Sequence, residues 1–240
     1  MVSVGNLTTG GTGKTPLVVW VARWLRERGV AVAILSRGYG AKPPQTRGRD
    51  APPTTAGETD EALLFRRFLP DVPHVVGADR VASGRRAIAE HGAQCLVLDD
   101  GFQHLALARD LNIAVVDSLL PFGYGHLLPR GLLREPLAAL RRADLIVLSR
   151  CDLASREELA AIRGRLGGAG AACPVVESAH RPVRFVRHGS GEGVLLEWAA
   201  GRKVAAFSAL GNPAAFLRTL AALGVEVAAH AAFRDHHWYS

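Results

Sequence analysis

A glycine-rich stretch near the start of the chain constrains the fold more than any other feature. Residues 5–16 read "GNLTTGGTGKTP" and lie between the apolar run "MVSV" and an amphipathic segment. Gly10, Gly11 and Gly13 let consecutive backbone N–H groups turn inward around phosphate oxygens, and a helix that follows adds the positive end of its dipole. This pattern predicts a phosphate-binding loop at a strand-to-helix junction.

The loop differs from the generic Walker A pattern GxxxxGK[ST] at one position, because Thr8 stands where the first glycine is expected. Its chemistry is otherwise suited to a nucleotide: Lys14 brings a cation to the β and γ phosphates, and Thr15 can bind Mg²⁺. A glycine-rich turn with an ordinary surface lysine is the weaker reading, since GKT follows a strand and opens a helix. The predicted cofactors are ATP and Mg²⁺, and the predicted nucleotide-binding residues are Thr8, Thr9, Gly10, Gly11, Thr12, Gly13, Lys14 and Thr15.

Short β-branched runs alternate with amphipathic stretches along the rest of the chain. This alternation predicts an α/β fold of the P-loop NTPase type, with a mostly parallel sheet flanked by helices. The expected strands are residues 2–4, 30–35, 74–76, 95–98, 113–117, 145–148 and 174–177. The expected helices are residues 14–29, 60–68, 81–91, 135–142, 156–166 and 213–223.

The same pass along the chain predicts three parts. They are a P-loop domain over residues 1–178, a β-hairpin linker over 179–202 turned around "HGSGEG", and the start of a smaller α/β lobe over 203–240. Residues 41–57 contain four prolines and no periodicity, so we expect a mobile loop near the site.

Composition narrows the range of partners. The net charge is +7 and the pI is about 10.0, with the basic residues spread along the chain, which favours anionic partners. Aromatic residues make up 6%, and no zinc or helix-turn-helix pattern interleaves with the arginines, so nucleic acid is not an expected partner.

The three cysteines have no CxxC spacing, and no apolar run approaches the ~18 residues needed to span a bilayer. We expect a cytoplasmic protein.

The second chemical motif is "CLVLDDGFQH", residues 95–104, an apolar strand that ends in two carboxylates. A P-loop protein places an acid here beside its metal. Adjacent residues of a strand point to opposite faces, so one of Asp99 and Asp100 is expected to face Mg²⁺, and the spacing does not say which. His104 is a candidate for substrate contact, with packing inside the loop as the alternative.

Further motifs follow in order along the chain: "LSRGYG" (35–40), the acidic pair 60–61 before "ALL", "VGADR" (76–80), "DDGFQH" (99–104), "LLPRGLLREP" (127–136) and "FRDHH" (233–237). With these motifs the sequence resembles the tetraacyldisaccharide 4'-kinases, the lipid A 4'-kinases of Gram-negative bacteria. Thr8 at the first Walker A position is also what this family looks like.

The resemblance implies transfer of the γ-phosphoryl group of ATP to the 4'-hydroxyl of a tetraacylated disaccharide 1-phosphate, giving lipid IVA. It implies Asp60 as the base on that hydroxyl, paired with His236, although His237 stays open as the partner. A base has independent sense, because a sugar hydroxyl needs an acceptor for its proton. From the residues alone, Asp60 could instead cap a helix and Arg80 could be a solvated arginine at a helix start. The implied roles are Mg²⁺ binding by Thr15, Asp99 and Glu135, phosphate or charge stabilisation by Lys14, Arg80 and Arg134, and substrate or charge stabilisation by Asp100 and His104.

Members of this family usually carry a membrane-embedding helix before the P-loop strand and a further α/β stretch after the "DHH" motif. We therefore expect a truncated chain. Peripheral contact with an anionic membrane surface, at the cytoplasmic face of the inner membrane, is expected from the positive charge and the apolar residues 119–133. The sequence carries no marker of an oligomeric state.

Three rival readings remain. A P-loop nucleotide switch or metallochaperone-type GTPase is suggested by "LSRCD" (148–152), a weak likeness to the guanine-reading NKxD motif. A ParA/MinD-like ATPase would carry a lysine where this chain has Thr9. A remnant could bind ATP without transferring phosphate. Preference for GTP or ATP separates the switch from the kinase.

Overall fold

The computed structural model describes residues 1–38 and 59–234. The predicted loop at 41–57 and the candidates His236 and His237 lie outside the described residues. The chain divides into two compact units. The first unit comprises Met1–Asn6, Gly13–Val115 and Arg142–Leu145, and the second comprises Leu7–Thr12, Val116–Arg141 and Ile146–Ser240.

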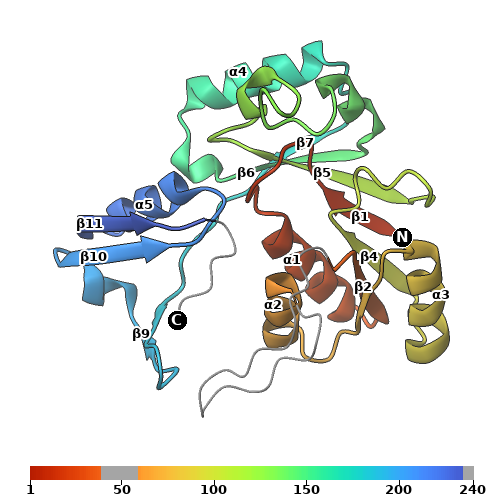
Figure 1. Cartoon of the computed structure of the whole chain (residues 1–240), viewed down its shortest axis with the longest axis horizontal. Coiled ribbons are helices and arrows are strands. Elements are labelled where there is room, and N and C mark those ends of the chain that lie inside the picture. Colours follow the sequence, from red (N-terminus) through yellow and green to blue (C-terminus); the bar gives the residue numbers. More distant parts are fainter. Residues whose placement is uncertain (39–58, 235–240) are drawn as a thin grey trace. The chain divides into compact units, whose positions relative to one another are not determined.

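The main sheet has seven strands in the order β3-β2-β4-β1-β5-β6-β7 (Figure 1). The pairs β1–β4, β1–β5, β2–β3, β2–β4 and β6–β7 are all parallel. The predicted α/β fold with a mostly parallel sheet is therefore confirmed. The strands are β1 Val2–Gly5, β2 Val32–Ser36, β3 His74–Val76, β4 Cys95–Asp99, β5 Leu111–Asp117, β6 Leu145–Ser149 and β7 Val175–Glu177.

Side-chain caps mark the starts of several helices. Thr59 Oγ1 accepts a hydrogen bond from the Ala62 amide at 3.2 Å, and Ser155 forms a capping box with Glu158. The helix expected over 135–142 is instead a shorter 3₁₀ helix with one buried residue, Leu140, as is common for short, weakly buried segments. The α-helices are α1 Lys14–Arg26, α2 Asp60–Phe68, α3 Arg80–His91, α4 Arg156–Gly168 and α5 Pro213–Ala222, and the 3₁₀ helices are η1 Gly123–Gly125, η2 Leu137–Arg142, η3 Cys151–Leu153 and η4 Leu196–Ala199.

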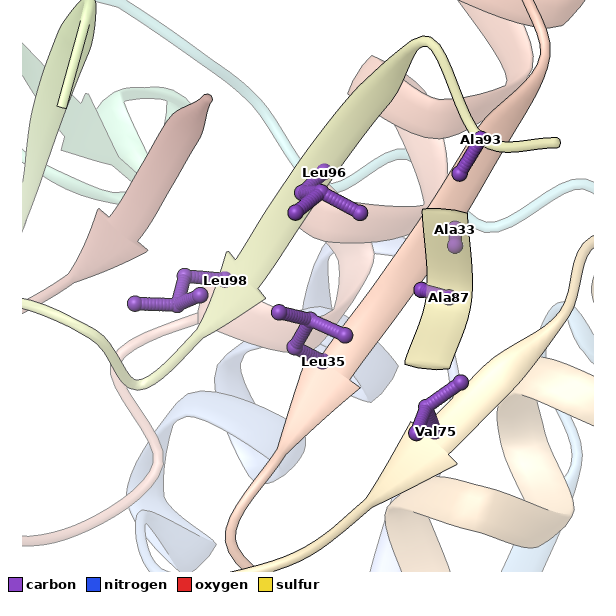
Figure 2. Packing of buried hydrophobic residues seen from close by; sticks show 7 residues of the cluster. All are labelled: Ala33, Leu35, Val75, Ala87, Ala93, Leu96 and Leu98. Atoms are coloured by element: carbon purple, nitrogen blue, oxygen red, sulfur yellow. The ribbon is translucent and has the colours of Figure 1, made fainter. Parts of the chain in front are cut away.

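A hydrophobic cluster fills the space between the sheet and α3 in the first unit (Figure 2). It combines leucines of β2 and β4 with the small Ala87 of α3, which lets the helix approach the strands closely. A Cβ at Gly84 of α3 would lie 3.2 Å from Leu96 Cδ1. The cluster contains Ala33, Leu35, Val75, Ala87, Ala93, Leu96 and Leu98.

The second unit ends in a small βαβ element. Strands β10 (Lys203–Ser208) and β11 (Glu226–Ala232) pair in parallel, and α5 connects them. Before it, β8 (Phe185–Val186) and β9 (Gly193–Val194) form the hairpin expected around "HGSGEG". The predicted boundaries between the three parts stay a prediction. Among the described residues, no helix combines the length and apolar character that crossing a membrane requires.

One partly buried histidine makes the stability of the fold depend on pH. A ring nitrogen of His74 lies 2.7 Å from Ser36 Oγ, and burial, followed by repulsion from Arg66, lowers the pKa of His74 from 6.5 to about 4. The unfolded chain takes up this proton near pH 6.5, whereas the folded chain takes it up only near pH 4. The stabilisation is therefore present above pH 6.5 and is lost as the pH falls from 6.5 to 4.

We expect the free energy of unfolding of the wild-type protein to fall by about 2–3 kcal/mol from this group between pH 6.5 and pH 4. His74→Gln should flatten this part of the profile, whereas the exposed His188→Gln serves as the control and should not. Denaturant titrations at a series of pH values measure the difference. Parallel profiles for the wild type and His74→Gln would contradict the assignment.

Candidate functional site

The P-loop needs glycine at two positions and not at Thr8. Gly10 and Gly13 have φ values of +101° and +88°, a conformation that favours glycine. Thr8 is absent from the positive-φ residues and forms an antiparallel bridge with Leu133. Extended backbone is allowed for residues that have a side chain, so this position does not need the conformational freedom of glycine. This explains why threonine is accommodated at the first Walker A position.

Polar side chains of the second unit hold the backbone of the loop. Ser149 Oγ donates to the Thr12 carbonyl oxygen at 2.7 Å, and Arg150 Nη2 donates to the Gly11 carbonyl oxygen at 2.7 Å. The Thr9 amide donates to the Leu132 carbonyl oxygen at 2.8 Å. The N–H and C=O groups of a peptide unit point in opposite directions, so bonds to these carbonyl groups set the direction of the amides that follow them.

Lys14, the first residue of α1, is held in the first unit by two acceptors. Its Nζ donates to Asn6 Oδ1 at 3.0 Å and lies 3.6 Å from Asp100 Oδ1. Asn6 is fully buried, and its carbonyl oxygen accepts a hydrogen bond from Gln103 Nε2 at 2.9 Å. The "DDGFQH" segment therefore positions the lysine, as expected for the two motifs of one nucleotide site.

The two aspartates differ in environment. Asp99 is the last residue of β4 and is buried, whereas Asp100 has a left-handed φ of +52° and contacts the lysine. Burial, followed by repulsion from Asp100, raises the pKa of Asp99 to about 7, although Lys14 acts in the opposite direction. A buried carboxyl group with a raised pKa lacks compensating positive charge.

This environment suits a divalent cation. No group of three potential metal-ligating side chains occurs in the part of the chain that the structure describes. Mg²⁺ is usually bound by one or two carboxylates together with phosphate oxygens and water, so Asp99 fits this group. Assignment of the ion to Asp99, with Thr15 and Glu135, stays a prediction.

Arg80 and His104 belong to the same polar cluster. Arg80 is buried, not solvated, and its Nη1 donates to the Gly77 carbonyl oxygen at 2.6 Å. Burial, then repulsion from Arg37, lowers the pKa of Arg80, while Asp99 and Asp100 oppose the shift. Burial and then Arg80 lower the pKa of His104, which keeps this imidazole neutral at pH 7. Its buried Nε2 has no hydrogen-bond partner among residues 1–38 and 59–234.

The remaining candidates belong to α2 in the first unit and to the segment before η2 in the second. Asp60 is the first residue of α2, and the helix is capped by the Thr59 side chain, so the capping role considered for Asp60 belongs to its neighbour. Glu61 contributes to the raised pKa of Asp99, which brings the start of α2 near the aspartate pair. Arg134 and Glu135 belong to the second unit, where the Arg134 amide donates to the Leu7 carbonyl oxygen at 2.6 Å.

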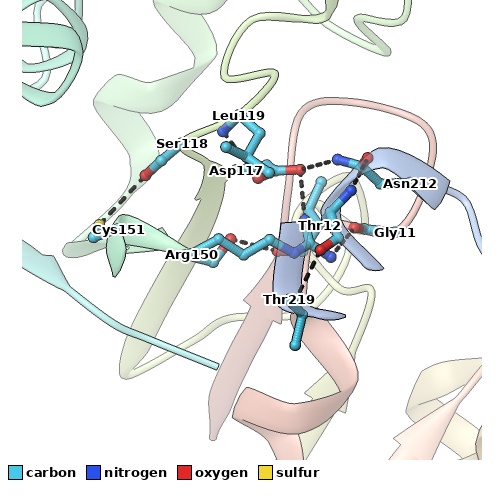
Figure 3. Close-up of polar contacts among 11 residues, drawn as sticks. Gly11, Thr12, Asp117, Ser118, Leu119, Arg150, Cys151, Asn212 and Thr219 are labelled. Atoms are coloured by element: carbon cyan, nitrogen blue, oxygen red, sulfur yellow. Dashed lines mark hydrogen bonds and ion pairs between the residues drawn. The ribbon is translucent and has the colours of Figure 1, made fainter. Parts of the chain in front are cut away.

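Sequence reasoning missed a second polar cluster, which Figure 3 shows at the carboxyl ends of β5 and β6. Asp117 Oδ2 accepts hydrogen bonds from Arg150 Nη1 at 2.6 Å and from Asn212 Nδ2 at 3.2 Å. The rule that ligands bind beyond the carboxyl ends of parallel strands could have identified Asp117 and Arg150. In the segment read as a faint guanine-binding motif, Ser149 and Arg150 hold the P-loop and Asp152 is exposed. That reading is not favoured.

A half-open hollow of about 340 Å³ adjoins this cluster in the second unit. The P-loop residues from Thr8 to Thr12 line it, together with residues at the start of α5. Leu119, Leu120 and Tyr124 add apolar surface. The hollow combines polar and apolar lining residues, as sites for small ligands do.

Together, the parallel sheet, the P-loop and the lysine–aspartate contact define a P-loop phosphate-binding protein of the α/β class. The family model described as "Tetraacyldisaccharide-1-P 4'-kinase" (LpxK) matches residues 1–240. The chain belongs to this family.

Relatives and a solved structure agree. The chain is 50% identical to a tetraacyldisaccharide 4'-kinase of Anaeromyxobacter dehalogenans, over 100% of this chain and 64% of the relative. It is 41% identical to that of Syntrophus aciditrophicus, over 100% of this chain and 67% of the relative. The crystal structure of the "apo" form of LpxK from Aquifex aeolicus in complex with ATP is 32% identical, with a TM-score of 0.68, and the match covers 98% of this chain and 71% of that one. The chain thus spans about two thirds of the length of the curated relatives it matches.

The raised pKa of Asp99 predicts a stabilising substitution. Its carboxyl group titrates near pH 4 in the unfolded chain and near pH 7 in the folded one, so stability falls as the pH rises through this interval. In metal-free buffer at pH 8, Asp99→Asn should raise the free energy of unfolding by about 2–4 kcal/mol, with little change below pH 4. Denaturant titrations at both pH values measure this. The exposed Asp71→Asn is the control, and equal behaviour of the two variants would contradict the assignment.

Proposed function

We propose that this protein transfers the γ-phosphoryl group of ATP to the 4'-hydroxyl of tetraacyldisaccharide 1-phosphate, forming lipid IVA. The observation that carries the proposal is the Lys14 ammonium group held by Asn6 and Asp100 beside the buried Asp99, in a chain that matches the 4'-kinase family over residues 1–240. The ATP complex of the Aquifex aeolicus relative supports ATP as the donor.

In this proposal the residues divide the work of a phosphoryl transfer. Amides of the P-loop and Lys14 bind the β and γ phosphates, and Thr15, Asp99 and Glu135 hold Mg²⁺, which supplies charge neutralisation when bound. Asp60, paired with His236, accepts the proton of the 4'-hydroxyl group. The hydroxyl oxygen then forms a bond to the γ phosphorus, and the bond between the γ phosphorus and the leaving ADP breaks. Arg80 and Arg134 stabilise the charge that develops on the transferred group, and Asp100 and His104 contact substrate or share in this stabilisation.

The direct test is incubation with ATP, Mg²⁺ and the disaccharide precursor, with mass spectrometry of the lipid product. Lys14→Met should lower kcat/KM by about 100-fold or more, because the lysine neutralises phosphate charge in the transition state. Lys203→Met, which removes an exposed lysine 3.5 Å from Glu226, is the matched control and should retain activity. A wild-type protein that forms no 4'-phosphorylated lipid would sink the proposal.

Two further measurements in the same assay test the role of Asp60 and distinguish the kinase from the alternative functions. Asp60→Asn should lower kcat while binding of MgATP is unchanged, because a base acts on the acceptor and not on the nucleotide. Tight selectivity for GTP without lipid phosphorylation would favour the nucleotide switch instead. ATP binding without transfer would favour the remnant.

We also propose peripheral contact with an anionic membrane at its cytoplasmic face. The positive net charge supports it, as do exposed residues of the stretch anticipated for this role. In the second unit, Tyr124, Leu127 and Leu128 are 70%, 45% and 51% exposed, and Arg130 beside them is exposed. Apolar side chains next to a cation suit the boundary between acyl chains and anionic headgroups.

Sedimentation with vesicles tests the contact. Leu127→Asp together with Leu128→Asp should reduce binding to vesicles containing phosphatidylglycerol by about tenfold, because two apolar contacts are lost and two negative charges are added. Leu195→Asp, at an apolar side chain that is 74% exposed elsewhere in the second unit, is the control. Equal loss in both, or equal binding to neutral and anionic vesicles, would refute the proposed contact.

A further inference from the structure

Asp117 connects three segments of the second unit (Figure 3). It is the last residue of β5 and is buried. Its Oδ2 accepts from Arg150 Nη1 at 2.6 Å and from Asn212 Nδ2 at 3.2 Å, and its Oδ1 accepts from the Leu119 amide at 3.1 Å. One buried carboxylate is thus shared by β5, the segment after β6 and the segment before α5.

Arg150 extends this connection to the P-loop. Its second terminal nitrogen, Nη2, donates to the Gly11 carbonyl oxygen at 2.7 Å, so one guanidinium group bridges the Asp117 carboxylate and the loop backbone. The residue has a φ of +58°, an uncommon conformation for a side chain other than glycine, which its contacts must outweigh. A lysine has a single nitrogen and cannot reproduce the two-armed geometry of the guanidinium group.

Asn212 extends the connection to α5. Its Oδ1 accepts from the Ala215 amide at 3.1 Å and caps the helix, while its Nδ2 donates to Asp117. A carboxylate at this position would cap the helix equally well but could not donate. The two bonds together require the amide group of asparagine.

We propose that Asp117, Arg150 and Asn212 form a brace that couples the start of α5 to the backbone of the P-loop and orders the loop for nucleotide. These three are positioning residues, since they act through Gly11 and not on the reacting atoms. The loop is rich in glycine, which loses more conformational freedom on ordering than any other residue. Holding the Gly11 carbonyl group before nucleotide arrives reduces that loss and therefore tightens binding. The inference rests on the proposed function only in taking MgATP as the ligand.

Two substitutions at one position provide the sharpest test. Asn212→Ser keeps a helix-capping oxygen but replaces the amide group that donates to Asp117 with a shorter hydroxyl group. Asn212→Asp keeps the cap and places a second carboxylate next to Asp117. With MgATP as the probe in isothermal titration calorimetry, we expect Kd to rise about threefold for Asn212→Ser and about 30-fold for Asn212→Asp.

Arg150→Lys provides an independent arm with a matched control. Arg163 also donates to a carboxylate, Glu177 Oε1 at 2.9 Å, and to a backbone carbonyl oxygen, that of Val175 at 3.2 Å, but it is exposed and remote from the loop in sequence. Arg150→Lys should raise the Kd of MgATP about tenfold, and Arg163→Lys should leave it unchanged. KM for the lipid acceptor should change in neither, which separates ordering of the loop from a general loss of structure.

The outcomes separate the brace from the kinase. Equal Kd values for Asn212→Asp and Asn212→Ser, or for Arg150→Lys and Arg163→Lys, would overturn the brace even in an active enzyme. A wild-type protein that binds MgATP but transfers no phosphate would refute the proposed function and leave the comparisons of Kd intact. A wild-type protein that does not bind MgATP would overturn both.

Discussion

The contact between the Lys14 ammonium group and the Asp100 carboxylate organises the polar side of the first unit. At 3.6 Å it draws the start of α1 to the end of β4, and the buried Asn6 completes the hold on the lysine. Asp99 then lies buried beside an acidic neighbour, which is why its pKa is raised to about 7. Burial lowers the pKa values of Arg80 and His104 in the same cluster, and the two aspartates oppose the shift of Arg80. A lysine, an arginine and two carboxylates gathered in this way suit the binding of phosphate and a cation.

In the second unit, hydrogen bonds to backbone carbonyl groups fix the conformation of the P-loop. Glycines make the P-loop able to wrap a phosphate, but the same freedom leaves its conformation weakly specified. Hydrogen bonds from Ser149 and Arg150 to the carbonyl groups of Thr12 and Gly11 supply that specification. The bridge between Thr8 and Leu133 does the same at the start of the loop.

The sequence predicted what depends on local pattern. Alternation of apolar runs located the seven strands of the main sheet within one or two residues, and α2 was located at its observed ends. Phosphate-loop chemistry identified Lys14 and the aspartate pair, because those residue types at that spacing have few other uses. The helix type at residues 137–142 was wrong, since the choice between α and 3₁₀ geometry in so short a segment depends on packing. The solvated alternative for Arg80 also fails, because its burial comes from segments distant in sequence.

The sequence by itself determined the fold class, the nucleotide loop and the family, because each depends on short continuous segments whose periodicity or chemistry can be recognised directly. Only the tertiary structure decided that Asp117, Arg150 and Asn212 share one carboxylate, since these residues are 33 and 62 positions apart along the chain and no motif joins them. It also decided the difference between Asp99 and Asp100. Burial and neighbouring charge set a pKa, and both are properties of packing that adjacent letters in a sequence do not carry.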